Sequence, residues 1–183
     1  MKPLMLMLAL AGSSLAEAHD RSWPGQKLAA TLPEAANFTQ RAVALSPVQQ
    51  AQVEGVLGEP LRTEDRAPTF YIGTDASSQA VGVVVFLDAT GTNGKIEIGE
   101  SIDPAGHLLH LVLFENSELV AVGKPAFLDA FAGKTSADMF MVGHDIVGPG
   151  NGKSAQIIAT AARRGLLLAA VALHVGTLPG GAP

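Results

Sequence analysis

A glycine-rich loop that leads into a helix is the stretch of the sequence best suited to bind a charged group. Residues 148–152 read Gly-Pro-Gly-Asn-Gly, and a helix-forming segment follows directly. Glycines let the backbone turn several N–H groups toward one point, and the start of a helix adds unpaired N–H groups and the positive end of its dipole. Such a loop suits a phosphate or another anion. The candidate ligands are Gly148, Gly150, Asn151, Gly152, Lys153 and Ser154.

A simpler interpretation of this loop stays open, because glycines are common turn residues and Asn151 or Ser154 would serve as an ordinary helix N-cap. The loop is not a nucleotide-binding P-loop. The pattern GxxxxGK[ST] requires a glycine at position 147, where this chain has Val147. Too little chain follows the loop to build the parallel α/β domain to which a P-loop belongs. The sequence therefore argues against nucleotide hydrolysis.

Other residues that often carry chemistry lack the spacing that it requires. His107 and His110 are an odd number of residues apart on a predicted strand, so they would face opposite sides of a sheet. Glu115 and Glu118 form a pair of carboxylates at a strand end, where acids are usually solvated. The chain has no HExxH, EF-hand or GxSxG pattern. We predict no metal site and no hydrolytic centre, and expect an electron-transfer or binding protein rather than a stand-alone enzyme.

The N-terminus has the features of a secretory signal. Lys2 provides a positive start, residues 3–12 are apolar, and residues 16–18 read Ala-Glu-Ala, a typical cleavage site. The mature chain would begin at His19, in the periplasm or outside the cell. A free N-terminal histidine can chelate copper, but that use requires a second histidine, which the sequence does not place. The chain has no cysteine, so the exported fold would depend on its core alone.

Length and charge indicate one domain that does not bind nucleic acid. The 183 residues carry a formal net charge of −5 with no basic patch. Residues 165–178 are strongly apolar but too short to span a bilayer, and Arg163 and Arg164 prevent an extension upstream. We interpret this run as the buried end of a helix and expect no transmembrane segment in the mature chain. A docking face for a membrane-bound partner is the alternative.

The patterning divides the chain into a signal at 1–18, a flexible lead at 19–32, a single domain at 33–178 and a tail at 179–183. Within the domain, β-branched and alternating segments joined by short turns predict an antiparallel sheet. The expected elements are a helix from Ser46 to Gly58, strands at 69–73, 80–87, 95–102 and 107–114, a short helix at 125–133 and a long helix at 154–173. The fold class predicted is α+β, a small twisted, mainly antiparallel sheet with packed helices.

Four short motifs in this order resemble the FMN-binding domain family over about residues 33–173. They are Leu-Ser-Pro at 45–47, the strand pair at 96–118, Phe-Leu-Asp-Ala-Phe-Ala-Gly-Lys at 127–134, and the segment 145–157 that contains the glycine-rich loop. The family includes flavin subunits of the Rnf and sodium-pumping NADH:quinone oxidoreductase complexes and small exported proteins, which this chain resembles most. The resemblance implies an FMN site at the loop, with Glu118 as a further binding residue, and a redox partner protein that can be membrane-bound.

The loop departs from the family at one position that matters chemically. Where family members attach FMN through a threonine, this chain has Asn151, and an amide cannot form that phosphoester. The preceding Ser-Gly-Ala of the family is Gly-Pro-Gly here. Two functions stay open: an exported domain that binds FMN non-covalently and transfers electrons, or a cofactor-free module that binds or assembles with a redox partner. The resemblance favours the first.

Overall fold

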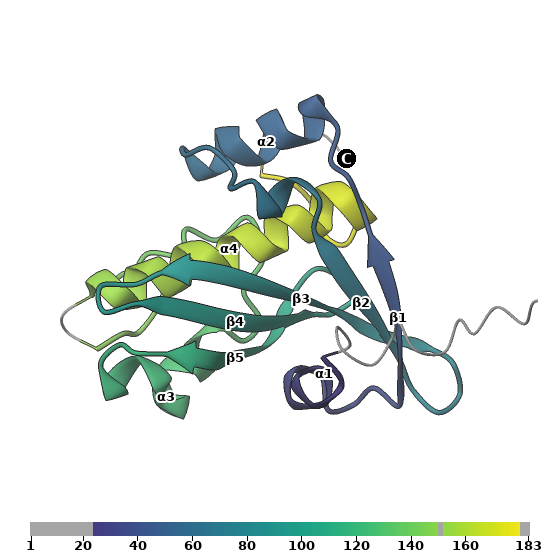
Figure 1. The fold of residues 1–183 in the computed structure, drawn as a ribbon, viewed down its shortest axis with the longest axis horizontal. Coiled ribbons are helices and arrows are strands. Elements are labelled where there is room, and N and C mark those ends of the chain that lie inside the picture. Colours follow the sequence, from purple (N-terminus) through teal and green to yellow (C-terminus); the bar gives the residue numbers. More distant parts are fainter. Residues whose placement is uncertain (1–23, 150–151, 180–183) are drawn as a thin grey trace, which may run out of the picture.

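The centre of the fold is a five-stranded antiparallel sheet with the order β1-β2-β3-β4-β5, so that each strand pairs with its neighbours in the sequence. The computed structural model describes residues 24–149 and 152–179. The strands are β1 (Asn37–Ala42), β2 (Thr69–Thr74), β3 (Ala80–Thr90), β4 (Lys95–Ile102) and β5 (Leu108–Asn116). With its packed helices, this sheet confirms the predicted α+β class (Figure 1).

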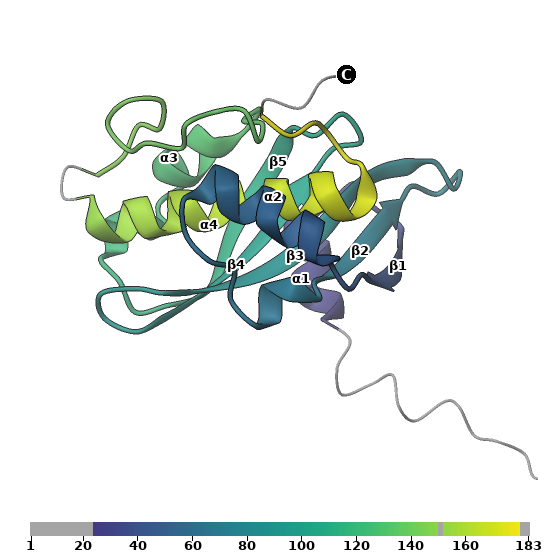
Figure 2. The same ribbon diagram turned by 90° about the horizontal axis from the view of Figure 1, so that it is seen from above.

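The helices form layers on both sides of the sheet. They are α1 (Gly25–Thr31), α2 (Pro47–Leu57), α3 (Pro125–Leu128) and α4 (Lys153–Leu173), with 3-10 turns at Glu64–Arg66, Val120–Gly123 and Asp129–Phe131. α4 lies along one face of the sheet and α2 packs on α4, as Figures 1 and 2 show. α1 contacts β4 and β5 from the opposite face. The main core therefore lies between α4 and the sheet.

Local sequence signals explain where several elements begin and end. Ser46 and Gln49 form the predicted capping box of α2, with each side chain accepting a hydrogen bond from the other residue's N–H, and Gly58 ends the helix in a left-handed conformation. The turn between β4 and β5 closes through a hydrogen bond of 3.0 Å from the N–H of Gly106 to the carbonyl of Asp103.

Two predicted segments differ from the structure. Residues 19–32 were expected to be a loosely held lead, but α1 covers part of this stretch, and Leu28 and Leu32 are fully buried. These two leucines lie one helical turn apart, a pattern that the glycine and prolines of the segment obscured. The helix expected over 125–133 is shorter, because α3 ends at Leu128 and continues as a 3-10 turn. Phe127 and Phe131 are nevertheless buried, as predicted.

α4 is the long core helix of the domain. Its length and composition alone would allow it to cross a membrane, but 72% of its most apolar window is buried within the fold. Leu166, Leu167 and Leu168 are almost completely buried. The apolar run at 165–173 therefore belongs to the core, which agrees with its interpretation as the buried end of a helix.

A glutamate occupies a core position of the sheet. Ile98, Glu100 and Ile102 alternate onto the face of β4 that α4 covers, and neither carboxyl oxygen of the fully buried Glu100 has a hydrogen-bond partner among the described residues. The space for this carboxyl comes from Gly165 of α4, where a Cβ atom would lie 2.2 Å from Glu100 Oε2. Burial raises the pKa of Glu100 well above its ordinary value, although Arg164 opposes the shift. The fold therefore favours the neutral acid.

Replacing Glu100 with a neutral side chain of similar length should stabilise the protein most at higher pH. An acid whose pKa is raised by folding binds more protons in the folded state, so stability falls as the pH rises above the ordinary value of 4.5. We expect Glu100→Met to raise the free energy of unfolding by about 1–3 kcal/mol at pH 7.5, and by less at pH 4, in urea titrations. The exposed Glu115→Met is the control and should leave the pH dependence unchanged. If Glu100→Met lowers the free energy of unfolding equally at both pH values, the raised pKa of Glu100 is wrong.

Candidate ligand-binding groove

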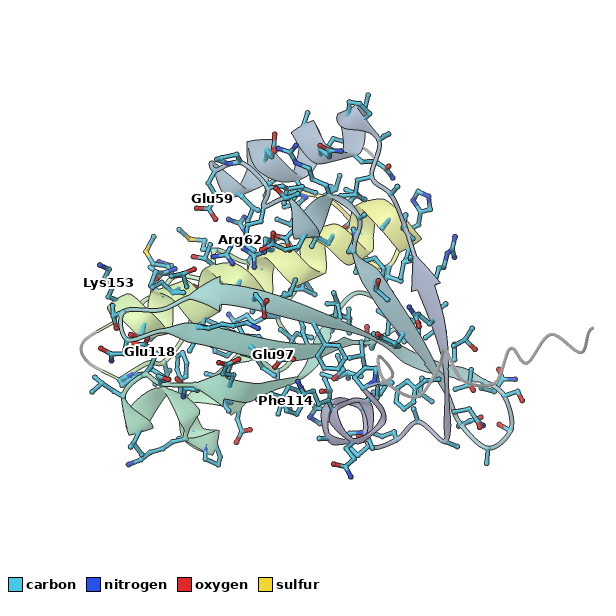
Figure 3. All side chains as sticks on the ribbon, in the orientation of Figure 1. Glu59, Arg62, Glu97, Phe114, Glu118 and Lys153 are labelled. Atoms are coloured by element: carbon cyan, nitrogen blue, oxygen red, sulfur yellow. The ribbon has the colours of Figure 1, made fainter. Side chains whose placement is uncertain are left out.

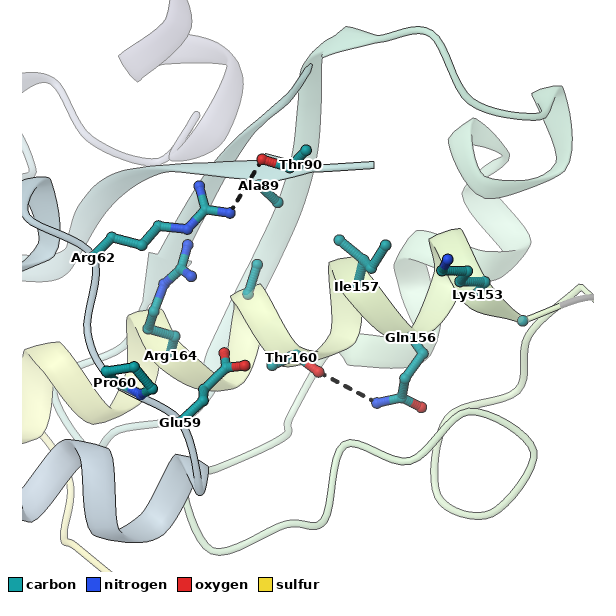
Figure 4. A pocket seen from close by; sticks show the side chains of 12 residues that line it. Glu59, Pro60, Arg62, Ala89, Thr90, Lys153, Gln156, Ile157, Thr160 and Arg164 are labelled. Atoms are coloured by element: carbon teal, nitrogen blue, oxygen red, sulfur yellow. Dashed lines mark hydrogen bonds between the residues drawn. The ribbon is translucent and has the colours of Figure 1, made fainter. Parts of the chain in front are cut away.

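An open groove of about 670 Å³ runs beside the first half of α4. One wall is α4, and the other is made by the end of β3 and by the segment that follows α2 (Figure 4). Its volume is in the range of small-molecule and cofactor sites. The charged and polar side chains that line it are Glu59, Arg62, Thr90, Lys153, Gln156, Thr160 and Arg164.

The period of the α helix explains which residues of α4 reach the groove. Lys153, Ile157, Thr160 and Arg164 recur every three or four residues, so they lie along one stripe of the helix. Ser154 lies outside this stripe and is almost completely buried. The groove therefore takes Lys153 from the predicted loop but not its neighbour.

Ser154 instead contacts Glu118, another residue predicted from the sequence to bind the ligand. The hydroxyl groups of Ser154 and Thr92 both donate hydrogen bonds to Glu118 Oε2, and the two hydroxyl oxygens are 2.9 Å apart. The N–H of Asn93 donates to Glu118 Oε1 at 2.7 Å. The hydrogen bond from Ser154, followed by that from Thr92, lowers the pKa of Glu118. A carboxylate of the protein itself therefore lies at the first turn of α4.

This carboxylate limits where an external anion can bind. An anion at the Ser154 hydroxyl would meet the negative charge of Glu118, whereas Lys153 is exposed and has no ion-pair partner among residues 24–149 and 152–179. Figure 3 shows Lys153 and Glu118 at the same end of the molecule. The free positive charge at this end therefore belongs to Lys153, on the groove side of α4.

The structure places the other predicted loop residues as follows. Gly152 is the residue before α4 and lines the groove. Gly148 does not line it, and a Cβ atom there would lie 2.4 Å from the side chain of Val142. Gly150 and Asn151 lie outside the described residues, so their role stays a prediction.

Gln156 positions the chain that leads into the loop. Its side-chain amide accepts a hydrogen bond of 3.0 Å from the N–H of Val142 and donates one of 2.8 Å to the carbonyl of Phe140. The carboxylate of Asp145 accepts two further backbone bonds in the same segment, from Phe140 and Met141. The two bonds of Gln156 attach the segment before the glycines to α4, and those of Asp145 hold the segment itself together.

The residues at the other end of the groove were not predicted from the sequence. Arg62 and Thr90 lie in segments without a recognisable motif, and Arg164 was noted only because it interrupts an apolar run. The one available signal was a charged residue in an otherwise buried helix, since such a charge requires a partner. Arg164 Nε indeed lies 3.1 Å from Asp65 Oδ2, and both side chains are buried.

Comparison with known proteins shows a similarity of fold but none of sequence. Neither a family model nor a curated protein matches the sequence. The crystal structure of Shewanella oneidensis NqrC is similar with a TM-score of 0.49 and 12% sequence identity, over 80% of this chain and 87% of that chain. A similarity of this extent carries no conclusion about function.

The contacts of Glu118 predict a pH-dependent contribution to stability. A lowered pKa means that the carboxylate stabilises the folded state above its unfolded-state pKa, and that this contribution is lost as the pH falls below about 4.5, through the folded-state pKa. We expect Glu118→Gln to lower the thermal midpoint at pH 7, with a difference from wild type that shrinks toward pH 3. Glu115→Gln, an exposed acid nearby, is the control. A difference that stays constant down to pH 3 would contradict this role.

Proposed function

We propose that the protein is an exported domain that binds FMN non-covalently and exchanges electrons with a redox partner. The observation that carries this proposal is the groove that begins at Gly152 and Lys153, directly beside the loop that resembles the flavin-binding element of the FMN-binding domain family. A cofactor-sized groove thus begins at the two described residues, Gly152 and Lys153, that end the predicted anion-binding loop.

The side chains of the groove fit the parts of FMN. The ammonium group of Lys153 and the start of α4 suit the phosphate. Pro60, Ile157 and Ala161 offer apolar surface for a ring system, and the hydroxyls of Thr90 and Thr160 offer hydrogen bonds at its edge. When bound, FMN supplies the capacity to accept and release one or two electrons. The chain's own contribution is to bind the cofactor, orient it and exclude water from one of its faces.

The non-covalent mode follows from the chemistry of Asn151. The position that corresponds to the family's threonine has no hydroxyl, so the phosphate would be held by charge and hydrogen bonds alone. Lys153 would provide the main charged contact, because the hydroxyl of Ser154 is already bonded to Glu118. A redox partner, proposed to be membrane-bound, would supply or accept the electrons.

FMN titration of the protein tests this function. We expect saturable binding, and Lys153→Ala should weaken it by about 1–2 kcal/mol, or roughly 5- to 30-fold in Kd, since one charge-assisted contact is lost. Lys124→Ala removes an exposed lysine away from the groove and should leave Kd unchanged. Flavin fluorescence quenching and calorimetry would measure both values.

A gel of denatured protein distinguishes the binding mode. Non-covalent FMN is released on denaturation, so the protein band should not fluoresce; a fluorescent band would contradict the proposal. If the folded protein binds no FMN but co-purifies with a subunit of a redox complex, the cofactor-free assembly module is the better description.

Export has its own test. The signal at residues 1–18 predicts cleavage after Ala18, so the intact mass of the exported protein should correspond to a chain that begins at His19. Blocking the site with Ala18→Pro should leave the uncleaved precursor in the membrane fraction. A mature protein that still carries Met1 would rule out the cleaved signal.

A further inference from the structure

Two arginine side chains converge on a single carbonyl oxygen at the inner end of the groove. Arg62 Nη1 donates to the carbonyl of Asp88 at 2.9 Å, and Arg164 Nη2 donates to the same oxygen at 2.7 Å. Figure 4 shows the two guanidinium groups next to each other on the groove wall. Arg62 comes from the segment after α2, and Arg164 comes from α4. Two like charges from distant parts of the chain are thus held in one place.

The sheet explains why this carbonyl is accessible. β2 pairs with β3 only over Ala80–Val85, so the last residues of β3 have a strand partner on the β4 side alone. The carbonyl of Asp88 would otherwise be an unpaired edge group, and its two lone pairs accept one bond from each arginine. Binding the carbonyl of Asp88 uses only one N–H of each guanidinium group.

The remaining donors of the pair are poorly used. Arg62 makes one further, long contact of 3.5 Å to the hydroxyl of Thr90, and its nearest carboxylate oxygen, on the exposed Glu64, is 3.8 Å away. Arg164 is compensated by Asp65 at 3.1 Å, but its buried Nε has no well-aligned hydrogen bond. Among the described residues, the charge of Arg62 is then balanced by the exposed Glu64, which contributes little, and by its share of the Asp65 charge.

Burial and the repulsion between the two guanidinium groups both disfavour the positive charge of Arg164 at this close spacing. Burial lowers the pKa of Arg164, and the neighbouring Arg62 adds to that lowering, whereas Asp65 opposes it. Glu59, on the rim of the groove, and Glu64 also oppose it, with smaller effects. An anion placed between the arginines would relieve their repulsion and use the free donors, because guanidinium groups match the geometry of oxyanions.

We propose that Arg62 and Arg164, with the hydroxyl of Thr90, form an oxyanion site for a phosphate or carboxylate group of the ligand. The site is separate from Lys153. The two positions on α4 are eleven residues apart in sequence, which corresponds to about 16 Å along a helix. The groove therefore takes an elongated ligand that has electron-rich oxygen groups at both ends. This inference rests on the groove being a ligand site, but not on the ligand being FMN.

Titration with inorganic phosphate, followed by the Nε–Hε NMR signals of the arginines, tests the site directly. In the wild-type protein we expect saturable shifts of the Arg62 and Arg164 signals. Arg62→Ala should weaken phosphate binding at the Arg164 signal by about tenfold, the scale of one lost charged hydrogen bond. A parallel titration with acetate shows whether a carboxylate serves as well as a phosphate. The absence of saturable shifts with either anion would overturn the proposal.

Arg66→Ala is the matched control, because Arg66 is an exposed arginine in the same segment that does not line the groove. Arg66→Ala removes the same charge and should leave phosphate binding unchanged. If Arg66→Ala and Arg62→Ala weaken phosphate binding equally, the weakening comes from the change in net charge, and the proposed arginine site is wrong. Arg62→Lys keeps the charge without the paired donors, so it should bind phosphate with intermediate affinity. This variant also tests the site if Arg62→Ala folds poorly.

Lys153→Ala separates this inference from the proposed function. If that variant loses phosphate binding while Arg62→Ala does not, the anion binds at the start of α4 alone and the arginine site is wrong. If phosphate shifts the arginine signals but FMN does not bind, the oxyanion site stands and the flavin function fails.

Discussion

The packing of α4 against the sheet is the constraint on which the rest of the structure depends. At Gly165 the helix has no side chain, so the carboxyl of Glu100 fits beneath it and α4 lies close to β4. This position aligns the inner face of α4 with the core and turns the stripe from Lys153 to Arg164 toward the groove that α4 forms with the end of β3 and the segment after α2. One helix thus closes the core and provides a wall of the candidate site.

Charged groups around α4 are accommodated in three different ways, and the differences define the site. Burial favours the neutral form of Glu100, whereas Arg164 is paired with Asp65. Glu118 stays ionised through hydrogen bonds at the first turn of the helix. Because these groups are compensated within the described part of the chain, Lys153 and Arg62 are the cations of the groove with the weakest ion pairing there. The proposed function depends on that imbalance.

Much of the fold could be predicted from local patterns, and less of the site. The capping box at Ser46, the turn at residues 103–106 and the alternation along β4 each act over a few residues, so they are readable in sequence. α1 was missed because a short helix depends on tertiary burial of Leu28 rather than on its own propensity. The contact between Glu118 and Ser154 brought two predicted residues together, although 36 positions separate them.

The sequence by itself determined the class of the fold and the order of its elements from α2 onward, and it predicted the loop before α4 as a place for an anion; α1 and β1 were not predicted. Only the tertiary structure decided that Ser154 faces Glu118, and that Arg62 lies beside Arg164. The physical reason is that caps, turns and periodicity arise from interactions between near neighbours. A groove arises where surfaces of α4, β3 and the segment after α2 meet, and no local pattern specifies which distant side chain will face it.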